Sequence, residues 1–378
     1  MPPIAWYRRL GRRSKRKQLV SQWLESDGLA FAPLREWMRA CLAEGEDGEV
    51  EAVYAEITDL SRVPTSDFAD LLDISYMGQL YEQGLRMADA WMEREPEASG
   101  PYNHAARLYS QMGRFEQSHE LHRLAMARSD ESAESCYQYG CTLLREKRLE
   151  EAENAFREAL LLDSRLGKAY TNLGFALDRK GATDGAIQQF KRAIQLDPQN
   201  AAGHYNLGAI YAERGEFDLA IRLFNKALEL DPASQEGRLN LGLALFNSNR
   251  HADAIEQFEK ALVQKPGNGE AWFFLGVSLS RMGAHNRALG AFQKARGYFP
   301  EDPRVLHYLG LCHVNRNEYG KALPIFKQVR ELMPEDGRNH YYLGIVYDKM
   351  GERERAERSY RKAESLGHRV LTRAAGQF

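Results

Sequence analysis

The sequence predicts an all-α protein built as a solenoid of about seven regular helix–turn–helix repeats of 34 residues, preceded by one or two degenerate repeats. Three observations support this fold class. Apolar residues recur at the i, i+3, i+4, i+7 spacing of one helix face. The pattern returns every 34 residues, without insertion or deletion, from residue 133 to residue 370. Glycine and proline fall at fixed points of the unit, where one helix must end and the next begin.

Residues 1–17 are predicted to form a basic tail, because seven of the ten residues from Arg8 to Lys17 are lysine or arginine. Such a segment fits contact with an anionic membrane, to which each basic side chain near the surface adds about 1 kcal/mol, or a nucleic-acid arm. The alternative is a solvated tail, or one that docks on the acidic run from Glu44 to Asp73. The residues of the possible membrane or anionic-partner contact are Trp6, Arg8, Arg9, Arg12, Arg13, Lys15, Arg16 and Lys17.

Residues 18–64 are predicted to form a helical N-terminal region or cap, and residues 65–132 to form degenerate repeats. In the first segment, the stretches APLREWMRACLAEG and EVEAVYAEITDL have the periodicity of helices. In the second, the unit at 99–132 keeps several repeat residues, but Ser118 and His122 replace the usual alanine and aromatic residue. The unit before it is predicted mainly from an apolar second helix and the proline that follows it.

The seven regular repeats occupy residues 133–370 and carry glycine at position 8, alanine at position 20 and an aromatic residue at position 24. Because glycine inside a helix costs roughly 1 kcal/mol against alanine, its recurrence indicates a steric need. Small residues let two helices approach closely, and the aromatic ring is expected to fill the gap between units. The glycines are Gly140, Gly174, Gly208, Gly242, Gly276, Gly310 and Gly344, and the aromatic residues are Phe156, Phe190, Phe224, Phe258, Phe292, Phe326 and Tyr360.

The turns and the end of the array follow from the same frame. Glycine at position 15 of four repeats suits a left-handed residue that ends the first helix, and proline at position 32 stops the second. Residues 371–378 are predicted to be a short C-terminal tail. Since Leu366, Val370, Leu371 and Phe378 then leave an apolar end without a polar cap, end-to-end self-association is a further hypothesis.

These small, aromatic and proline positions resemble those of the tetratricopeptide repeat family, whose unit is a 34-residue helix pair. The resemblance covers residues 133–370 and implies a right-handed superhelix whose first helices line a concave groove. Family members that bind the C-terminal carboxylate of chaperones carry Lys at position 5 and Asn at position 9 of one repeat. No repeat of this chain has that pair, so the resemblance implies a protein ligand of another kind.

An apolar stripe is expected along that groove, and a contiguous exposed apolar surface usually marks a binding site. Grooves of this kind receive a helix or an extended peptide. The alternative is that neighbouring first helices or a terminal segment cover the stripe. The predicted groove residues are Tyr137, Asn172, Phe175, Tyr205, Asn206, Leu239, Asn240, Leu243, Phe273, Phe274, His307 and Tyr341.

Three of these residues, Asn172, Asn206 and Asn240, form a column at position 6 whose amides could bind a peptide backbone. The column is similar to the asparagine ladder in the repeats of O-linked N-acetylglucosamine transferases. Asn is also common at this position in the family, so solvated amides are the alternative. Because aromatic residues replace Asn from Phe274 onward, the groove is expected to prefer apolar or aromatic ligand side chains there.

No catalytic site, metal or cofactor is predicted, because the sequence lacks a Gly-rich phosphate loop, a GxSxG elbow and an HExxH motif. His119 and His122 share a helix face, but no third ligand is near them in sequence. A net charge of -2 argues against nucleic acid as a general partner. The sequence has four cysteines without CxxC spacing, no apolar run of the roughly 18 residues that span a membrane, and no signal-peptide core. These features predict a cytoplasmic protein, and peripheral membrane contact is left open.

The sequence therefore predicts a non-enzymatic, cytoplasmic scaffold that binds a peptide or helix of a partner protein in its groove. The alternative is a self-assembling structural protein that its basic N-terminus tethers to a membrane. In that case the groove would be filled by the protein's own N-terminal region or by a neighbouring copy.

Overall fold

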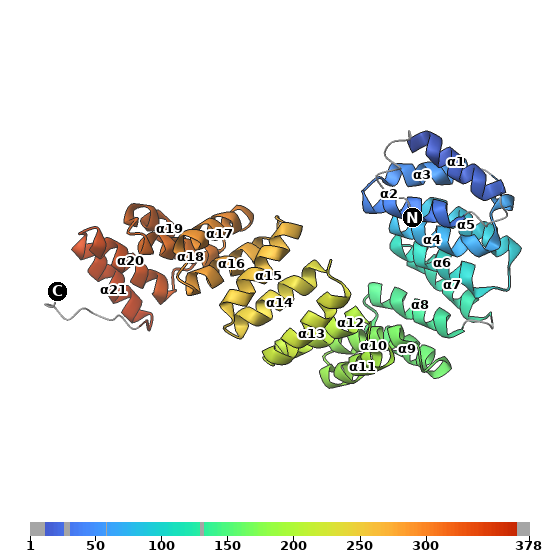
Figure 1. The fold of residues 1–378 in the computed structure, drawn as a ribbon. Helices are drawn as coiled ribbons and strands as arrows, with labels where there is room; N and C mark the ends of the chain where they lie inside the picture. Colours follow the sequence, from blue (N-terminus) through green and yellow to red (C-terminus); the bar gives the residue numbers. More distant parts are fainter. Residues whose placement is uncertain (1–11, 26–30, 58, 129–131, 369–378) are drawn as a thin grey trace. The chain divides into compact units, whose positions relative to one another are not determined.

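The predicted all-α fold is confirmed. The computed structural model describes residues 12–25, 31–57, 59–128 and 132–368. This part of the chain contains 21 α-helices and two short 3-10 helices and no strand (Figure 1). The helices group into two compact units, residues 1–198 and residues 199–378, which we call the N-terminal unit and the C-terminal unit.

The N-terminal unit begins with three helices that share a core with the first helix pair. Trp23, Tyr54 and Phe68 are completely buried there, and the indole N–H of Trp23 donates to Asp67 Oδ2 at 2.8 Å. Four helix pairs follow (Figure 1). The elements are α1 Arg12–Glu25, α2 Phe31–Ala43, α3 Asp47–Glu56, η2 Leu60–Arg62, η3 Thr65–Asp67, α4 Phe68–Met77, α5 Tyr81–Arg94, α6 Ser99–Gln111, α7 Phe115–Met126, α8 Ser132–Arg145, α9 Leu149–Leu162, α10 Gly167–Arg179 and α11 Thr183–Leu196.

The C-terminal unit consists of five helix pairs, each matching one predicted repeat (Figure 1). The position 24 rings Phe224, Phe258, Phe292 and Phe326 are at most 1% exposed; the first three belong to one buried cluster and Phe326 to a second. The helices are α12 Ala201–Glu213, α13 Phe217–Leu230, α14 Gln235–Asn247, α15 His251–Gln264, α16 Gly269–Arg281, α17 His285–Tyr298, α18 Pro303–Asn315, α19 Tyr319–Leu332, α20 Gly337–Lys349 and α21 Arg353–Ser365.

The glycine at position 8 of each regular repeat lies against the aromatic ring at position 24 of the same repeat. A Cβ atom on Gly276 would lie 2.7 Å from Phe292 Cε1, and one on Gly140 would lie 2.6 Å from Phe156 Cε1. Both distances are shorter than van der Waals contact, so the steric need for glycine is confirmed. The ring therefore fills space within its own repeat first, and not only the gap between units that the sequence analysis expects.

The turn between the two helices of a repeat contains a residue with positive φ, as predicted for the glycines at position 15. Gly215 has φ 76° and Gly351 has φ 83°. Repeats without glycine at position 15 also have a positive φ there: Lys147 has φ 62° and Asn249 has φ 60°. Gln79, at the equivalent point of the first degenerate repeat, has φ 57°. The same turn geometry therefore extends into the degenerate part of the array.

Polar residues that break the repeat pattern at 99–132 find partners inside the fold. Ser118 Oγ donates to the carbonyl oxygen of Ala106 at 2.8 Å. His122 is completely buried, and its Nε2 lies 2.9 Å from Thr142 Oγ1. Burial, and then the nearby His119, lower the pKa of His122 to about 3, so its ring is neutral at physiological pH. The degenerate repeat thus keeps its helix pair by giving Ser118 and Nε2 of His122 a partner each, although Nδ1 of His122 has none among the described residues.

The acidic run near the N-terminus is partly used inside the N-terminal unit. Asp70 accepts hydrogen bonds from Arg35 at 2.7 Å and from Arg39 at 3.2 Å. Asp73 forms an ion pair with Arg107. These internal ion pairs already neutralise both carboxylates, so they contribute less attraction for a basic tail than the sequence suggests.

The predicted basic contact residues fall partly inside α1. Trp6, Arg8 and Arg9 lie outside the described residues, whereas Arg12, Arg13, Lys15, Arg16 and Lys17 belong to α1. The helix therefore starts within the segment that the sequence analysis assigns to a tail. In the described part of the chain, no helix combines the length and apolar character that crossing a membrane requires.

The last helix carries the polar surface that the sequence analysis expects to be missing. Its sequence, RERAERSYRKAES, buries Ala356 and Ala363 and places charged residues on the remaining surface. Leu366 ends this helix and is half-buried. Val370, Leu371 and Phe378 lie outside the described residues, so the predicted apolar end remains a hypothesis. The hypothesis of end-to-end self-association depends on the absence of a polar cap. The charged face of α21 supplies such a surface and therefore weakens that hypothesis.

Candidate functional site

The candidate site lies on the first helices of the repeats in the C-terminal unit, α12, α14, α16, α18 and α20. Side-chain contacts join each of these helices to the next one. We call the surface formed by their position 5 and position 6 side chains the first-helix face. Its members are Tyr205, Asn206, Leu239, Asn240, Phe273, Phe274, His307, Tyr308, Tyr341 and Tyr342.

The aromatic residues at position 6 stack on the position 24 ring of the preceding repeat. The ring centroid of Tyr308 lies 5.3 Å from that of Phe292, with an interplanar angle of 11°. Tyr342 lies 5.7 Å from Phe326 with an angle of 8°. Phe274 repeats the arrangement one unit earlier: its ring centroid lies 6.2 Å from that of Phe258, with an interplanar angle of 22°. These rings therefore complete the core on one side, and all three residues remain half-buried on the first-helix face.

Edge-to-face contacts then join the rings of successive repeats into one continuous aromatic row. Phe273 meets Tyr308 at 5.8 Å, and His307 meets Tyr342 at 5.3 Å, with interplanar angles of 71° and 72°. Within α20, Tyr341 meets Tyr342 at 5.4 Å. The row is a rigid apolar surface, because each ring is held by at least two others.

The asparagines at position 6 bond to tyrosines of the preceding repeat. Asn240 Nδ2 donates to Tyr205 Oη at 2.6 Å. In the N-terminal unit, Asn172 Nδ2 donates to Tyr137 Oη and to Cys141 Sγ, both at 3.2 Å. The side chain of Asn206 has no hydrogen-bond partner among the described residues. The amide oxygens of Asn172 and Asn240 remain available as acceptors, but one of their donors is already engaged.

Most predicted groove residues are half-buried, but Phe273 is buried and only 8% exposed. The guanidinium carbon of Arg304, from the next repeat, lies 5.4 Å from the centre of its ring. Lys168 Nζ similarly lies 4.5 Å from the ring centre of Tyr137 in the N-terminal unit. In both pairs, a cation at position 2 covers the position 5 ring of the preceding repeat. The apolar periodicity of the sequence does not indicate this contact.

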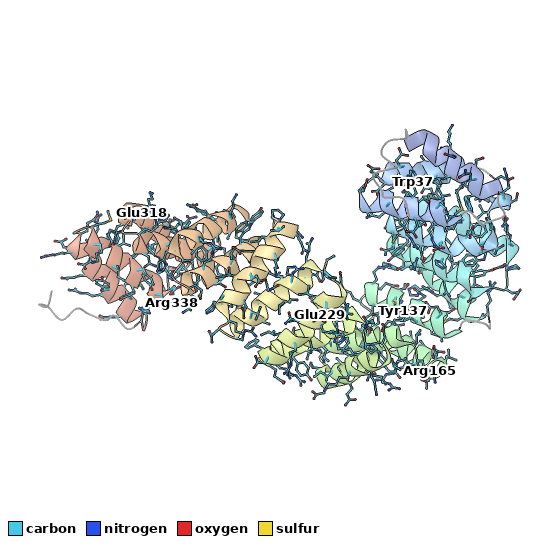
Figure 2. The ribbon with its side chains drawn as sticks, in the orientation of Figure 1. Trp37, Tyr137, Arg165, Glu229, Glu318 and Arg338 are labelled. Atoms are coloured by element: carbon cyan, nitrogen blue, oxygen red, sulfur yellow. The ribbon has the colours of Figure 1, made fainter. Side chains whose placement is uncertain are left out.

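Leu239 and Leu243 on α14 are half-buried beside the aromatic row. In the N-terminal unit, Phe175 on α10 is 36% exposed, and the guanidinium carbon of Arg179 lies 5.2 Å from its ring centre. Tyr137 lies on α8 (Figure 2). The predicted groove residues are thus divided between two units, and the larger set belongs to the C-terminal unit.

The charges at the edge of the first-helix face are unevenly distributed. Arg304 donates to Asp302 at 2.7 Å and 3.1 Å, which holds the pKa of that carboxyl below its usual range. Arg338, at the start of α20 (Figure 2), donates to Asp336 at 3.2 Å and 3.3 Å. Glu236 and Glu270 occupy the same repeat position in earlier repeats, and neither forms an ion pair with a described residue.

Burial controls the titration of the groups on this face. The pKa of Tyr205 is raised by burial and then by the carboxylate of Glu236. The pKa of His307 is lowered to about 4 by burial and then by the charge of Arg338. His307 is therefore a neutral ring at physiological pH and part of the apolar row.

Sequence reasoning did not include Tyr308, Tyr342, Arg304 and Glu270 among the predicted site residues. The two tyrosines carried a signal, because both interrupt the asparagine column at position 6. The other two occupy position 2, which the family resemblance also assigns to the groove. That Arg304 and Glu270 border the ring of Phe273 becomes visible only in the contact between neighbouring repeats.

Of the two histidines of α7, His119 lines a polar hollow of about 720 Å³ in the N-terminal unit, whereas His122 is completely buried. His119 Nε2 lies 2.7 Å from Glu146 Oε1, and its Nδ1 lies 3.2 Å from Tyr139 Oη. No group of three or more His, Cys, Asp and Glu residues suited to a metal ion occurs in the described part of the chain.

Comparison with known proteins finds the repeat family over more than half of the chain. Models described as TPR repeat or tetratricopeptide repeat match residues 133–165, 179–215, 201–234, 239–303, 275–340 and 338–366. No curated protein matches the chain.

Solved structures with similar folds include PilF of Pseudomonas aeruginosa, at 20% identity and a TM-score of 0.51, covering 57% of this chain and 97% of that chain. A chain of the APC/C hetero-tetramer Cut9–Hcn1 matches at 18% identity and a TM-score of 0.50, covering 79% of this chain and 59% of that one. YrrB, described as a TPR protein with an unusual peptide-binding site, matches at 26% identity and a TM-score of 0.45, covering 49% of this chain and 96% of YrrB. The first two similarities concern the fold alone.

Proposed function

Because the chain belongs to the tetratricopeptide repeat family, we propose that it is a protein–protein interaction scaffold whose first-helix face in the C-terminal unit binds a segment of a partner protein. The observation that supports this proposal is the continuous row of aromatic rings from Phe274 to Tyr342. Tyr and Phe rings supply large contact areas at low cost in conformational entropy, as in other recognition surfaces.

The segment bound is proposed to be an extended peptide or an amphipathic helix that lays apolar side chains on this row. The edge of an aromatic ring carries partial positive charge and its face partial negative charge, so the carbonyl oxygens of a ligand backbone and its aromatic side chains are suitable partners for these rings. The oxygen of Asn240 and the amide of Asn206 add polar contacts at the other end of the face. No catalytic role is included in this proposal, since the function follows from binding alone.

The test is a crosslinking capture from native cell extract that compares two double variants. Tyr308→Asn with Tyr342→Asn removes two rings and installs the residue that other repeats carry at the same position. The matched control, Val263→Asn with Leu332→Asn, changes two exposed apolar residues on second helices. We expect captured proteins to be lost only with the first variant. Equal capture by both variants would remove the first-helix face as the binding site.

A further inference from the structure

A small cavity opens beside the aromatic row, between α16 and α18. Its volume is about 100 Å³, and its lining residues are Glu270, Phe273, Phe274, Phe299, Asp302, Arg304 and Val305. We propose that this cavity is a specificity pocket for one basic side chain, lysine or arginine, of the bound partner. The proposal rests on the function proposed above and adds the chemical class of one ligand residue.

The floor of the cavity is apolar and aromatic. Phe273 is 8% exposed, and Phe274 is half-buried beside it on α16. Phe299, the residue that caps the end of α17, is 39% exposed at the mouth. Three phenyl rings thus surround a space of side-chain size. Because Arg304 already lies over the ring of Phe273 and Phe274 stacks on Phe258, this lining is suited to the apolar stem of a ligand side chain and not to its charged head.

The charged residues at the mouth leave one negative charge uncompensated. Asp302 and Arg304 neutralise each other, because the guanidinium donates to the carboxylate at 2.7 Å and 3.1 Å. Glu270 is exposed and forms no ion pair or hydrogen bond with a described residue. Glu270 and Arg304 both line this cavity, so the carboxylate lies at the same opening as the Asp302–Arg304 pair. A ligand that enters the cavity therefore meets a free carboxylate above an aromatic floor.

Lysine and arginine match both parts of this site. Their aliphatic stems can lie on the rings while the cationic head reaches the carboxylate of Glu270. A purely apolar side chain would remove water from Glu270 without replacing its interactions, which costs free energy. The pocket thus favours a long, unbranched, basic side chain.

The position of Glu270 has a structural role that must be separated from binding. It lies in the first turn of α16, where a negative charge interacts favourably with the helix dipole. Glu270→Gln keeps the side-chain shape but removes this charge, so it is expected to preserve the helix content and to lower the stability only by the small contribution of one charge near a helix end. Circular dichroism and the melting temperature measure these effects separately from binding. Glu331→Gln is the matched control. It removes an exposed carboxylate that has no partner among the described residues, from the second helix α19.

The experiment is a selection of random 12-residue peptides, displayed on phage, against the immobilised full chain. We expect the selected peptides to share one aligned Lys or Arg. A synthetic copy of the best one should bind the Glu270→Gln variant roughly 3- to 10-fold more weakly and bind Glu331→Gln unchanged.

Two other outcomes would overturn the proposal, and they are distinguishable. Peptides that need Tyr308 and Tyr342 but show no basic position, or bind Glu270→Gln equally well, would exclude the pocket and leave the binding face intact. Peptides that bind the Tyr308→Asn, Tyr342→Asn variant as well as the wild type would exclude the first-helix face itself, and the pocket with it.

Discussion

Asn240 donates a hydrogen bond of 2.6 Å to the hydroxyl of Tyr205, 35 residues earlier in the chain. This bond links the first helices of two successive repeats, and it shows that a side chain at position 6 reaches position 5 of the repeat before it. The aromatic residues at position 6 use the same offset to meet the ring of the preceding repeat. One register therefore organises both the polar and the aromatic parts of the first-helix face.

Tyr205→Phe should destabilise the protein by about 0.5–1.5 kcal/mol, because it removes the acceptor of the Asn240 amide. Tyr211→Phe, on the same helix, is the control, since its hydroxyl has no hydrogen-bond partner among the described residues. Urea unfolding followed by far-UV circular dichroism measures both. Equal effects of the two substitutions would mean that the bond contributes nothing to stability.

Gly276→Ala should destabilise the protein even though alanine is the better helix former. The new methyl group would lie 2.7 Å from the ring of Phe292, and overpacking of about 1–3 kcal/mol outweighs a gain of about 1 kcal/mol in helix propensity. Gly290→Ala, on α17, meets no atom within 4 Å and should stabilise by about 0.5–1 kcal/mol. Thermal unfolding of the two variants tests this prediction. Melting temperatures that shift in the same direction for both variants would contradict the packing argument.

Lys147→Gly should stabilise the protein by roughly 0.5–1 kcal/mol, because Lys147 holds a φ of 62° that costs an L-residue energy and costs glycine little. The reciprocal substitution Gly215→Lys, at a φ of 76° with no atom within 4 Å, should destabilise by a similar amount. Melting temperatures measured under identical conditions test the pair. A lower melting temperature for Lys147→Gly would show that the lysine side chain contributes an interaction of its own.

Acid should destabilise the wild type more than the His307→Phe variant. The pKa of His307 is lowered to about 4 in the folded chain from an ordinary 6.5, so the unfolded chain binds the proton more readily between these values. Stability is thus fully present above pH 6.5 and falls toward pH 4, by up to about 1.4 kcal/mol per pH unit. Arg338 and Asp336, which also act on this ring, remain in the variant.

The measurement for this prediction is denaturant unfolding at a series of pH values from 7 to 4. Phenylalanine keeps the ring contacts of His307 with Tyr308 and Tyr342 but cannot bind a proton. Other buried histidines, such as His104 and His122, titrate equally in both proteins and cancel in the comparison. Parallel curves for wild type and variant would show that His307 does not cause the loss.

The sequence was sufficient to predict the repeat and its turns, because these depend on contacts inside one repeat. Gly276 and Phe292 belong to the same 34-residue unit, and the positive φ of Gly215 is a local property of the chain. Such short-range requirements recur with the repeat, so a single sequence displays them several times. Even the polar exceptions Ser118 and His122 were visible as departures from the pattern.

The surface of the site was less predictable, because it depends on which residue of the next repeat covers each ring. Phe273 was expected to line the groove, but Arg304 lies over it from the following first helix. The asparagine column looked free in sequence, whereas Asn240 is bonded to Tyr205. Both contacts require the register between neighbouring first helices, which periodicity alone does not specify.

The most direct test of the proposed binding face places a photo-crosslinking amino acid, p-benzoylphenylalanine, at Tyr308 and, in a second protein, at Val263. Both are illuminated in native cell extract and the adducts are identified by mass spectrometry. Tyr308 belongs to the aromatic row, whereas Val263 is 83% exposed on a second helix. We predict a discrete adduct with one partner protein from Tyr308 and none from Val263. An adduct from Val263 alone would contradict the central claim.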